Sequence, residues 1–92
     1  MVFGWDENKN RTNIAKHRID FADVLQMFDG PMQVEPDTRE DYGEDRWVGI
    51  GLLRNIVAVV VFAEPSTDTI RIISARKANK YERTKFEQWL AE

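Results

Sequence analysis

The spacing of apolar and polar residues predicts helices toward both ends of the chain and strands between them. After the N-terminal run VFGW, the segment DENKNRTNIAKH contains good helix formers and no Gly or Pro. Asp6 is a suitable N-cap, so we predict a helix over about Glu7–His17. Only Ile14 and Ala15 are apolar within it, and this helix therefore has a small face for packing on a core.

The segment DFADVLQMFDGP has the clearer pattern of an amphipathic helix. Four of its apolar residues recur at positions i, i+3, i+4 and i+7, Asp20 can cap the start, and Gly30-Pro31 ends the helix. These four residues are Phe21, Val24, Leu25 and Phe28. We predict a short helix that packs this face against the core.

Strands are predicted in the middle of the chain. MQVE (residues 32–35) has the pattern of a short strand, and the acidic, turn-rich stretch after it is expected to lie in solvent. RWVGIGLL and IVAVVVFAE flank Arg54-Asn55, which is typical of a hairpin whose second, continuously apolar strand is covered on both faces. TIRIIS is a third strand, in which Arg71 projects from the face opposite to its two isoleucine neighbours.

A last helix is predicted from about Asn79, with Phe86, Trp89 and Leu90 anchoring one side of it to the core. The order of a strand, two helices, three or four antiparallel strands and a helix predicts an α+β fold. We expect a single domain over residues 1–92 with two layers. These are a mainly antiparallel sheet of about four strands and a set of helices, two N-terminal and one C-terminal.

The charges are segregated along the chain, although the formal net charge is only −3. Residues 1–18 carry a net +2, residues 19–69 carry three Arg and eleven acids, and residues 70–92 carry a net +3. An anionic partner responds to the local field, which salt screens over about 10 Å. The acidic sequence pI, near 5.2, is therefore compatible with binding of RNA to the basic ends.

Two basic segments contain residues suited to chemistry on a phosphodiester. Lys16 and His17 end the first predicted helix, where His17 can act as an acid or base or simply cap the helix. Arg71 projects from a strand and Arg76 and Lys77 follow near its end, where guanidinium groups can stabilise a pentavalent phosphorane. Equally, Arg71 can pair with an acid and the other two can be solvated.

Acidic and aromatic residues add further candidates. Glu64 is the only acid in the most apolar strand, so it is either a general base toward a ribose 2′-hydroxyl or an ordinary exposed strand-end residue. Glu82 falls on the core side of the last helix, which favours a structural ion pair with Arg or Lys. Trp5, Tyr42 and Tyr81 offer surfaces on which unpaired bases can stack, as does Trp47.

Several classes of protein are disfavoured. The chain has no Cys and a single His, which exclude a disulfide framework, a thiolate nucleophile and a His cluster. The acids at residues 35–45 lack the spacing of a calcium-binding loop, so no metal or other cofactor is predicted. The longest apolar run, IVAVVVFA, is too short to span a bilayer, and no signal-peptide pattern is present, so we expect a cytoplasmic protein without membrane attachment.

The segments WDENKNRTNIAKHRIDFADVLQMFDGP and RIISARKANKYER together resemble the BrnT family, the toxin half of type II toxin-antitoxin pairs. The likeness runs over nearly the whole chain. It rests on Trp5-Asp6, Lys9, Asn13, Lys16-His17, Phe21, Phe28-Asp29, the RIISAR strand and Glu82-Arg83. The resemblance implies a RelE-like fold and a ribonuclease that needs no metal and arrests translation. It also implies a BrnA-type antitoxin whose ribbon-helix-helix module binds operator DNA.

The resemblance also suggests site residues. Lys16, His17, Arg71, Arg76 and Glu82 match the polar pattern of the family, and Glu64 is added on chemical grounds. From these, the expected catalytic set is Lys16, His17, Glu64, Arg71 and Arg76, and the expected RNA-binding set is Trp5, Lys9, Arg18, Lys77, Lys80 and Arg83. Arg18 stands where the family usually has Gly, at a position expected to be left-handed.

The hypothesis from the sequence is thus an endoribonuclease that cleaves RNA by transesterification. Glu64 or His17 would take the 2′-hydroxyl proton, Arg71 and Arg76 would stabilise the phosphorane, and Lys16 or His17 would assist the leaving oxygen. The alternative is a non-catalytic module that uses the same basic surface to bind nucleic acid or an antitoxin, and acts as a co-repressor.

Overall fold

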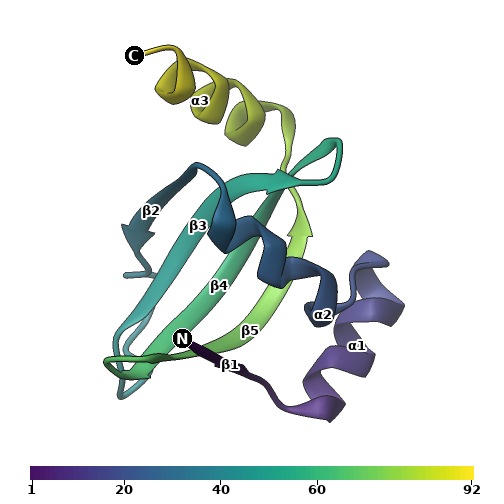
Figure 1. Ribbon diagram of the computed structural model, residues 1–92, viewed down its shortest axis with the longest axis vertical. Coiled ribbons are helices and arrows are strands. Elements are labelled where there is room, and N and C mark those ends of the chain that lie inside the picture. Colours follow the sequence, from purple (N-terminus) through teal and green to yellow (C-terminus); the bar gives the residue numbers. More distant parts are fainter.

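The computed structural model describes residues 1–92, which form one five-stranded sheet with helices around it (Figure 1). The strand order is β1-β5-β4-β3-β2. In chain order the elements are β1 (Val2–Gly4), α1 (Glu7–His17), α2 (Phe21–Val24), the 3-10 helix η1 (Leu25–Asp29), β2 (Met32–Pro36), β3 (Arg46–Leu53), β4 (Ile56–Ser66), β5 (Thr69–Lys77) and α3 (Lys80–Ala91).

The sheet is mixed and has five strands instead of about four. Strands β2 to β5 form the predicted antiparallel meander, in which β4 is central and Arg54-Asn55 make the β3–β4 turn. The additional strand is β1, which pairs in parallel with β5 so that Val2 lies opposite Thr69. This pairing joins segments more than sixty residues apart, and a three-residue strand carries no local pattern that could reveal it.

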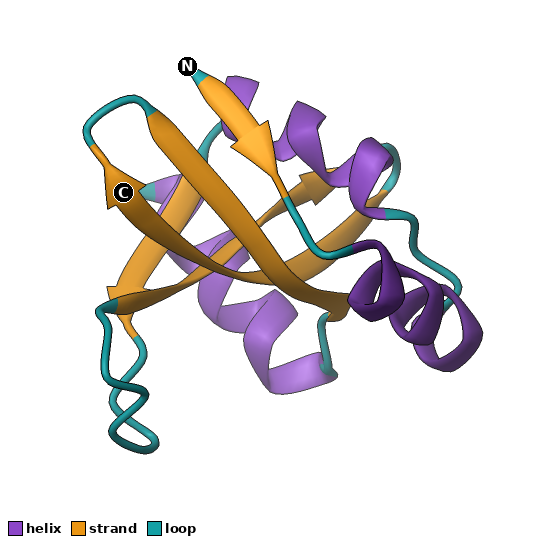
Figure 2. Cartoon of the chain, turned by 90° about the horizontal axis from the view of Figure 1, so that it is seen from below, coloured by secondary structure: helices purple, strands orange, loops and turns teal.

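The helices lie on both sides of the sheet, which corrects the expected two-layer arrangement. Helices α2 and η1 pack on one face, α3 packs on the other face near the end of β5, and α1 lies beside β5 (Figures 1 and 2). Because side chains of β4 alternate, Val60 belongs to the core under α2 while Val59 contacts the α3 side. The continuously apolar β4 is thus covered on both faces, as predicted.

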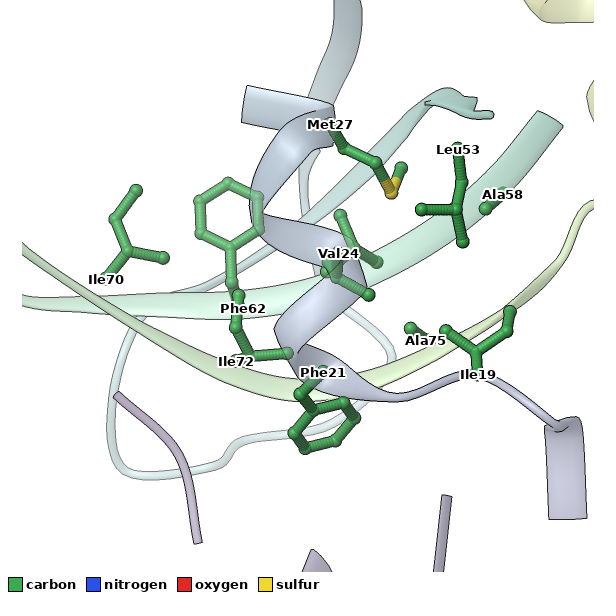
Figure 3. Close-up of a cluster of buried hydrophobic side chains, with 11 residues drawn as sticks. Ile19, Phe21, Val24, Met27, Leu53, Ala58, Phe62, Ile70, Ile72 and Ala75 are labelled. Atoms are coloured by element: carbon green, nitrogen blue, oxygen red, sulfur yellow. The ribbon is translucent and has the colours of Figure 1, made fainter. Parts of the chain in front are cut away.

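The larger core lies between the sheet and the segment from Ile19 to η1 (Figure 3). Phe21, Val24 and Met27 are almost fully buried there, against residues of β4 and β5. Asp20 caps α2 as predicted, accepting a hydrogen bond from the Ala22 N–H at 3.0 Å. The predicted apolar helix is therefore present, but its second half is a 3-10 helix. Met27 is the fully buried residue of that half, and Leu25 and Phe28 are half-buried and pack against the core as predicted.

Helix α1 is held by amide side chains in place of an apolar stripe. Its buried residues are Asn10 and Asn13, whereas Ile14 is exposed. Asn10 accepts a hydrogen bond from the Phe21 N–H at 2.9 Å and donates one to Asp20 at 3.0 Å. The small apolar face seen in the sequence therefore reflects polar docking, in which the buried amide groups are hydrogen-bonded.

Helix α3 begins with a capping box. Asn79 accepts from the Glu82 N–H at 2.8 Å, and Glu82 accepts from the Asn79 N–H at 2.9 Å. Phe86 is fully buried in the smaller core and Trp89 packs against that core, as expected. Leu90 is 44% exposed, so its predicted anchoring role is wrong. None of the helices has the length and apolar character needed to cross a membrane.

Candidate functional site

The site is built around the second half of β5, where no other strand pairs with the outer edge of β5. Strand β1 pairs only with residues 69–71, and beyond them α1 runs alongside β5. The Asn13 amide acts like a short piece of neighbouring strand, because it donates to the Ala75 carbonyl at 2.9 Å and accepts from the Ala75 N–H at 3.1 Å. This pair of buried hydrogen bonds fixes α1, and with it Lys16 and His17, against β5.

The first pocket lies between α1 and β5 and has a volume of about 360 Å³. Its charged residues are Lys9 and Lys16, accompanied by His17, and no carboxylate lines it. The remaining lining residues are Asn8, Thr12, Asn13, Ile73 and Ser74. Cations, hydroxyl groups and amides without an acid form a surface suited to an anion such as phosphate.

A second pocket, of about 200 Å³, opens on the sheet face that α3 covers only in part. Its lining includes the basic residues Arg39 and Arg76, together with Ser74 and Glu82. The register of β5 against β4 shifts at Ile73, so Ala75 faces the larger core while its two neighbours face this pocket. Ser74 and Arg76 share a side of the sheet by strand alternation, and the irregularity turns that side away from the larger core that contains Ile72.

Arg76 is held by Glu82 through a two-point ion pair. The two terminal guanidinium nitrogens each lie 2.8 Å from a carboxylate oxygen. These hydrogen bonds raise the pKa of Arg76 and lower the pKa of Glu82. The capping box fixes Glu82 in turn, so the predicted structural ion pair is confirmed and positions a half-exposed guanidinium. A guanidinium has five N–H donors, which leaves Arg76 with donors for a phosphate.

Ser74 lines both pockets, so the two pockets adjoin at the edge of β5. Lys16 and His17 line the pocket beside α1, and Arg76 lines the pocket on the sheet face. The two basic segments, far apart in the sequence, therefore border adjoining pockets. We call the two pockets together the β5 groove, with an α1 side and a sheet side.

Arg71 lies on the same sheet face but outside the β5 groove, and it pairs with Glu44. The sequence allowed Arg71 to pair with an acid, and the structure confirms such a pair with Glu44 as the partner. Glu44 also binds Arg46 at 3.2 Å, and both arginines lower the pKa of its carboxyl. Arg46 in turn lies over the ring of Tyr42, 4.1 Å from its centre. The connector predicted to lie in solvent is mostly exposed, but Glu44 ties it to the sheet.

A second ion pair in the connector involves a buried acid. Asp37 is 8% exposed and binds Arg39 with both carboxylate oxygens at 2.8 Å. Hydrogen bonds from Arg39 lower the pKa of Asp37 from 3.8 to about 2. Arg39 also lines the sheet side of the β5 groove, so Asp37 helps to position a cation there.

The depressed pKa of Asp37 predicts acid sensitivity. A carboxyl with a lower pKa in the folded state stabilises the fold above its unfolded pKa, and this contribution is lost as the pH falls through the folded value. We expect on the order of 1–2 kcal/mol to disappear between pH about 4 and pH about 2, after allowance for the exposed Arg39. Urea unfolding across this range measures it, and Asp37→Asn should flatten the decline. An equal decline in the variant would contradict the assignment.

The other predicted site residues are more dispersed. Glu64 is exposed and lies outside the β5 groove, so the structure does not bring it to the other candidates. Trp5 packs edge-on against Phe21 and donates to Glu7 at 2.6 Å, which leaves it half-buried beside the core. Arg18 has the expected left-handed backbone, with φ 60°. The three remaining cations are exposed at the end of β5 and on α3: Lys77, Lys80 and Arg83.

Sequence reasoning missed several residues of the β5 groove. Ser74 was not among the predicted site residues, and Arg39 belongs to the stretch that was expected to lie in solvent. On α1, however, Asn8 and Thr12 follow from the helical period, since they lie one turn apart on the face that carries Lys9 and Lys16. Arg39 had no comparable signal, because its position depends on the buried Asp37.

Comparisons with known proteins agree with this geometry. A family described as "Ribonuclease toxin, BrnT, of type II toxin-antitoxin system" matches residues 5–82. The 1.1 Å crystal structure of the Brucella abortus ribonuclease toxin BrnT is similar with a TM-score of 0.72 and 32% sequence identity, over 87% of this chain and 100% of that chain. No curated protein matches. On the strength of these two matches, this chain belongs to the BrnT family of ribonuclease toxins from type II toxin-antitoxin systems.

Proposed function

We propose that the chain is an endoribonuclease toxin that arrests translation by cutting RNA in the β5 groove. The observation that carries this proposal is that Ser74 lines both the pocket of Lys16 and His17 and the pocket of the Glu82-held Arg76. Cations from opposite sides of one strand can contact a single phosphodiester together, with no acid on the α1 side to repel it.

The reaction we propose is transesterification. The ribose 2′-oxygen attacks the adjacent phosphorus and gives its proton to His17, while the bond from phosphorus to the 5′-oxygen breaks. Lys16 protonates the departing 5′-oxygen, so the products end in a 2′,3′-cyclic phosphate and a 5′-hydroxyl. Arg76 stabilises the additional negative charge of the phosphorane. Because cationic side chains stabilise the phosphorane in this proposal, we expect cleavage to proceed without a metal ion.

The position of Glu64 narrows the choice of base. His17 lines the β5 groove, whereas Glu64 does not. We therefore assign the base to His17. Arg71, which was expected to act beside Arg76, is proposed to bind a flanking phosphate after exchange with Glu44, because both residues are half-exposed. The ion pair between them also ties the connector to the sheet.

We further propose that a BrnA-like ribbon-helix-helix antitoxin neutralises the toxin in the cytoplasm. Membership of a type II family implies a protein antitoxin. The basic β5 groove is a suitable surface for it to cover, since covering the groove would block RNA. In this proposal the antitoxin binds operator DNA, and the toxin is present at the operator only in complex with the antitoxin.

Expression in a bacterial host tests the cellular function. We expect wild-type protein to stop growth within minutes of induction and to reduce amino-acid incorporation before RNA synthesis falls. Co-expression of the antitoxin should restore growth, and His17→Ala should be much less toxic than wild type at equal protein levels. Normal growth with abundant soluble wild-type protein would contradict toxicity and would favour the co-repressor alternative.

A further inference from the structure

A third pocket lies immediately beyond the end of α1. One of its residues directly follows a residue of the β5 groove in the sequence. The third pocket has a volume of about 310 Å³ and is lined by Arg18, which directly follows His17, and by the β3–β4 turn. Its other lining residues are Ile19, Asp23, Leu53, Arg54, Asn55 and Ile56. This size is at the lower end of pockets that hold small organic ligands. We call it the turn pocket.

Two unusual backbone positions meet in the turn pocket. Arg18 and Arg54 are the two residues other than Gly with positive φ in the chain, at 60° and 55°. Gly is favoured at both kinds of position, a helix C-terminus and a tight hairpin turn, because a Cβ atom costs about 1 kcal/mol in this conformation. The same pocket thus receives an arginine from each of two loops, 36 residues apart in the sequence.

The charge of the turn pocket favours an anion. Arg54 is paired with Asp23 at 3.2 Å, the one acid in the lining, but its side chain is 69% exposed. Arg18 forms no ion pair and is exposed. The lining therefore carries two cations and one partly exposed carboxylate. A phosphate can bind Arg18 directly and can share Arg54 with Asp23.

The floor of the turn pocket is apolar. Ile19 and Leu53 are buried, at 6% and 5% exposure, and Ile56 is half-buried beside them. Apolar lining residues beside two arginines match a nucleotide, whose base has an apolar face and whose phosphate is charged. An acidic peptide would match the charges too. Because Arg18 directly follows His17, however, an RNA strand bound in the β5 groove can extend into this pocket, which favours RNA as the occupant.

From these observations, we propose that the turn pocket is a second nucleotide subsite for single-stranded RNA. Arg18 and Arg54 bind a phosphate, and the apolar floor contacts the base of a nucleotide flanking the scissile bond. The proposal rests on the proposed function, because it extends the same RNA strand past the end of α1. Its expected effect is on affinity for longer strands and not on the chemical step.

Binding of a labelled single-stranded 2′-deoxy oligonucleotide of about ten nucleotides tests this subsite without cleavage. The variant Arg18→Gly with Arg54→Gly removes both charges at positions where Gly is sterically favoured, so it should be at least as stable as wild type. We expect roughly tenfold weaker binding. The slope of log affinity against log salt should be smaller by about 0.7, which is the contribution of one phosphate contact with a single strand.

Two further variants provide controls. Arg18→Lys with Arg54→Lys keeps both charges and should retain most of the affinity. Arg11→Ala removes an exposed arginine that lies outside the turn pocket and the β5 groove, and it should have little effect. Unchanged affinity and salt slope in the glycine variant would overturn the subsite, and so would a loss of antitoxin binding with unaltered oligonucleotide binding.

The subsite and the proposed function can fail separately. If wild type binds the oligonucleotide with the expected difference between variants but does not cleave RNA, the subsite stands and the nuclease proposal fails. If wild type cleaves RNA and the glycine variant binds as tightly as wild type, the subsite fails alone. Absence of oligonucleotide binding by wild type itself would also overturn the subsite.

Discussion

Replacement of Arg76 by Ala is expected to lower the rate constant of RNA cleavage by about 100-fold to 1000-fold. The change removes the guanidinium that we assign to the phosphorane, and loss of one such preorganised donor typically has an effect of this size. The ion pair with Glu82 is also lost, but the pair is half-exposed and should contribute only about 1 kcal/mol to stability. Single-turnover cleavage of a short labelled RNA measures the chemical step.

Matched variants separate catalysis from positioning. Arg11→Ala, another arginine removed from the same protein, should cleave at the wild-type rate. Arg76→Lys keeps the positive charge but loses the planar guanidinium that can bind two oxygens at once, so we expect partial activity. Glu82→Gln keeps a group that can accept the capping hydrogen bond but removes the charge that orients Arg76, and it should act mainly on the rate. Cleavage by Arg76→Ala at the rate of Arg11→Ala would show that Arg76 is not catalytic.

Replacement of Asn13 by Ala is expected to be the most destabilising single change on α1. It removes the hydrogen bonds from Asn13 to the Ile19 carbonyl and to both backbone groups of Ala75, all of them buried. Buried backbone groups left without partners cost about 1–3 kcal/mol each, so we expect a loss of at least about 3 kcal/mol in the free energy of unfolding. Urea denaturation followed by tryptophan fluorescence provides the measurement.

Asn8 offers the matching control, because it is an exposed amide on the same helix. Asn8→Ala loses only a hydrogen bond from Arg11 and should change stability by less than about 0.5 kcal/mol. If Asn13→Ala were equally mild, α1 would not depend on its amide contact with β5. Other contacts would then have to hold α1, and with it His17, beside β5.

The sequence predicted the elements that rest on local spacing. The β3–β4 hairpin, the third strand, α2 and α3 are present where their apolar periods placed them, since each period records which side faces the core. Helix α1 is present where its helix formers and the Asp6 cap placed it. An N-terminal strand was predicted, but its position in the sheet was not. Its parallel partner is more than sixty residues away, and no local pattern encodes such a contact.

The candidate site was predictable where it lies on regular elements. Lys16 and His17 at the end of α1, and the Glu82 ion pair of α3, follow from helical spacing and capping. The partner of Arg71 did not follow, because Glu44 belongs to a connector without a repeating pattern. Polar docking through Asn13 was also hidden, since a buried Asn and an exposed Asn look the same in a sequence.

The central claim is that the β5 groove cleaves RNA, and the most direct measurement is incubation of purified protein with an end-labelled single-stranded RNA in the presence of EDTA. We predict shorter products that carry a 2′,3′-cyclic phosphate and a 5′-hydroxyl, formed at equal rates by wild type and Arg11→Ala and at least about 100-fold more slowly by Arg76→Ala. Intact RNA that is only retarded in a gel, with a steep dependence on salt, would contradict the claim and identify a binding module.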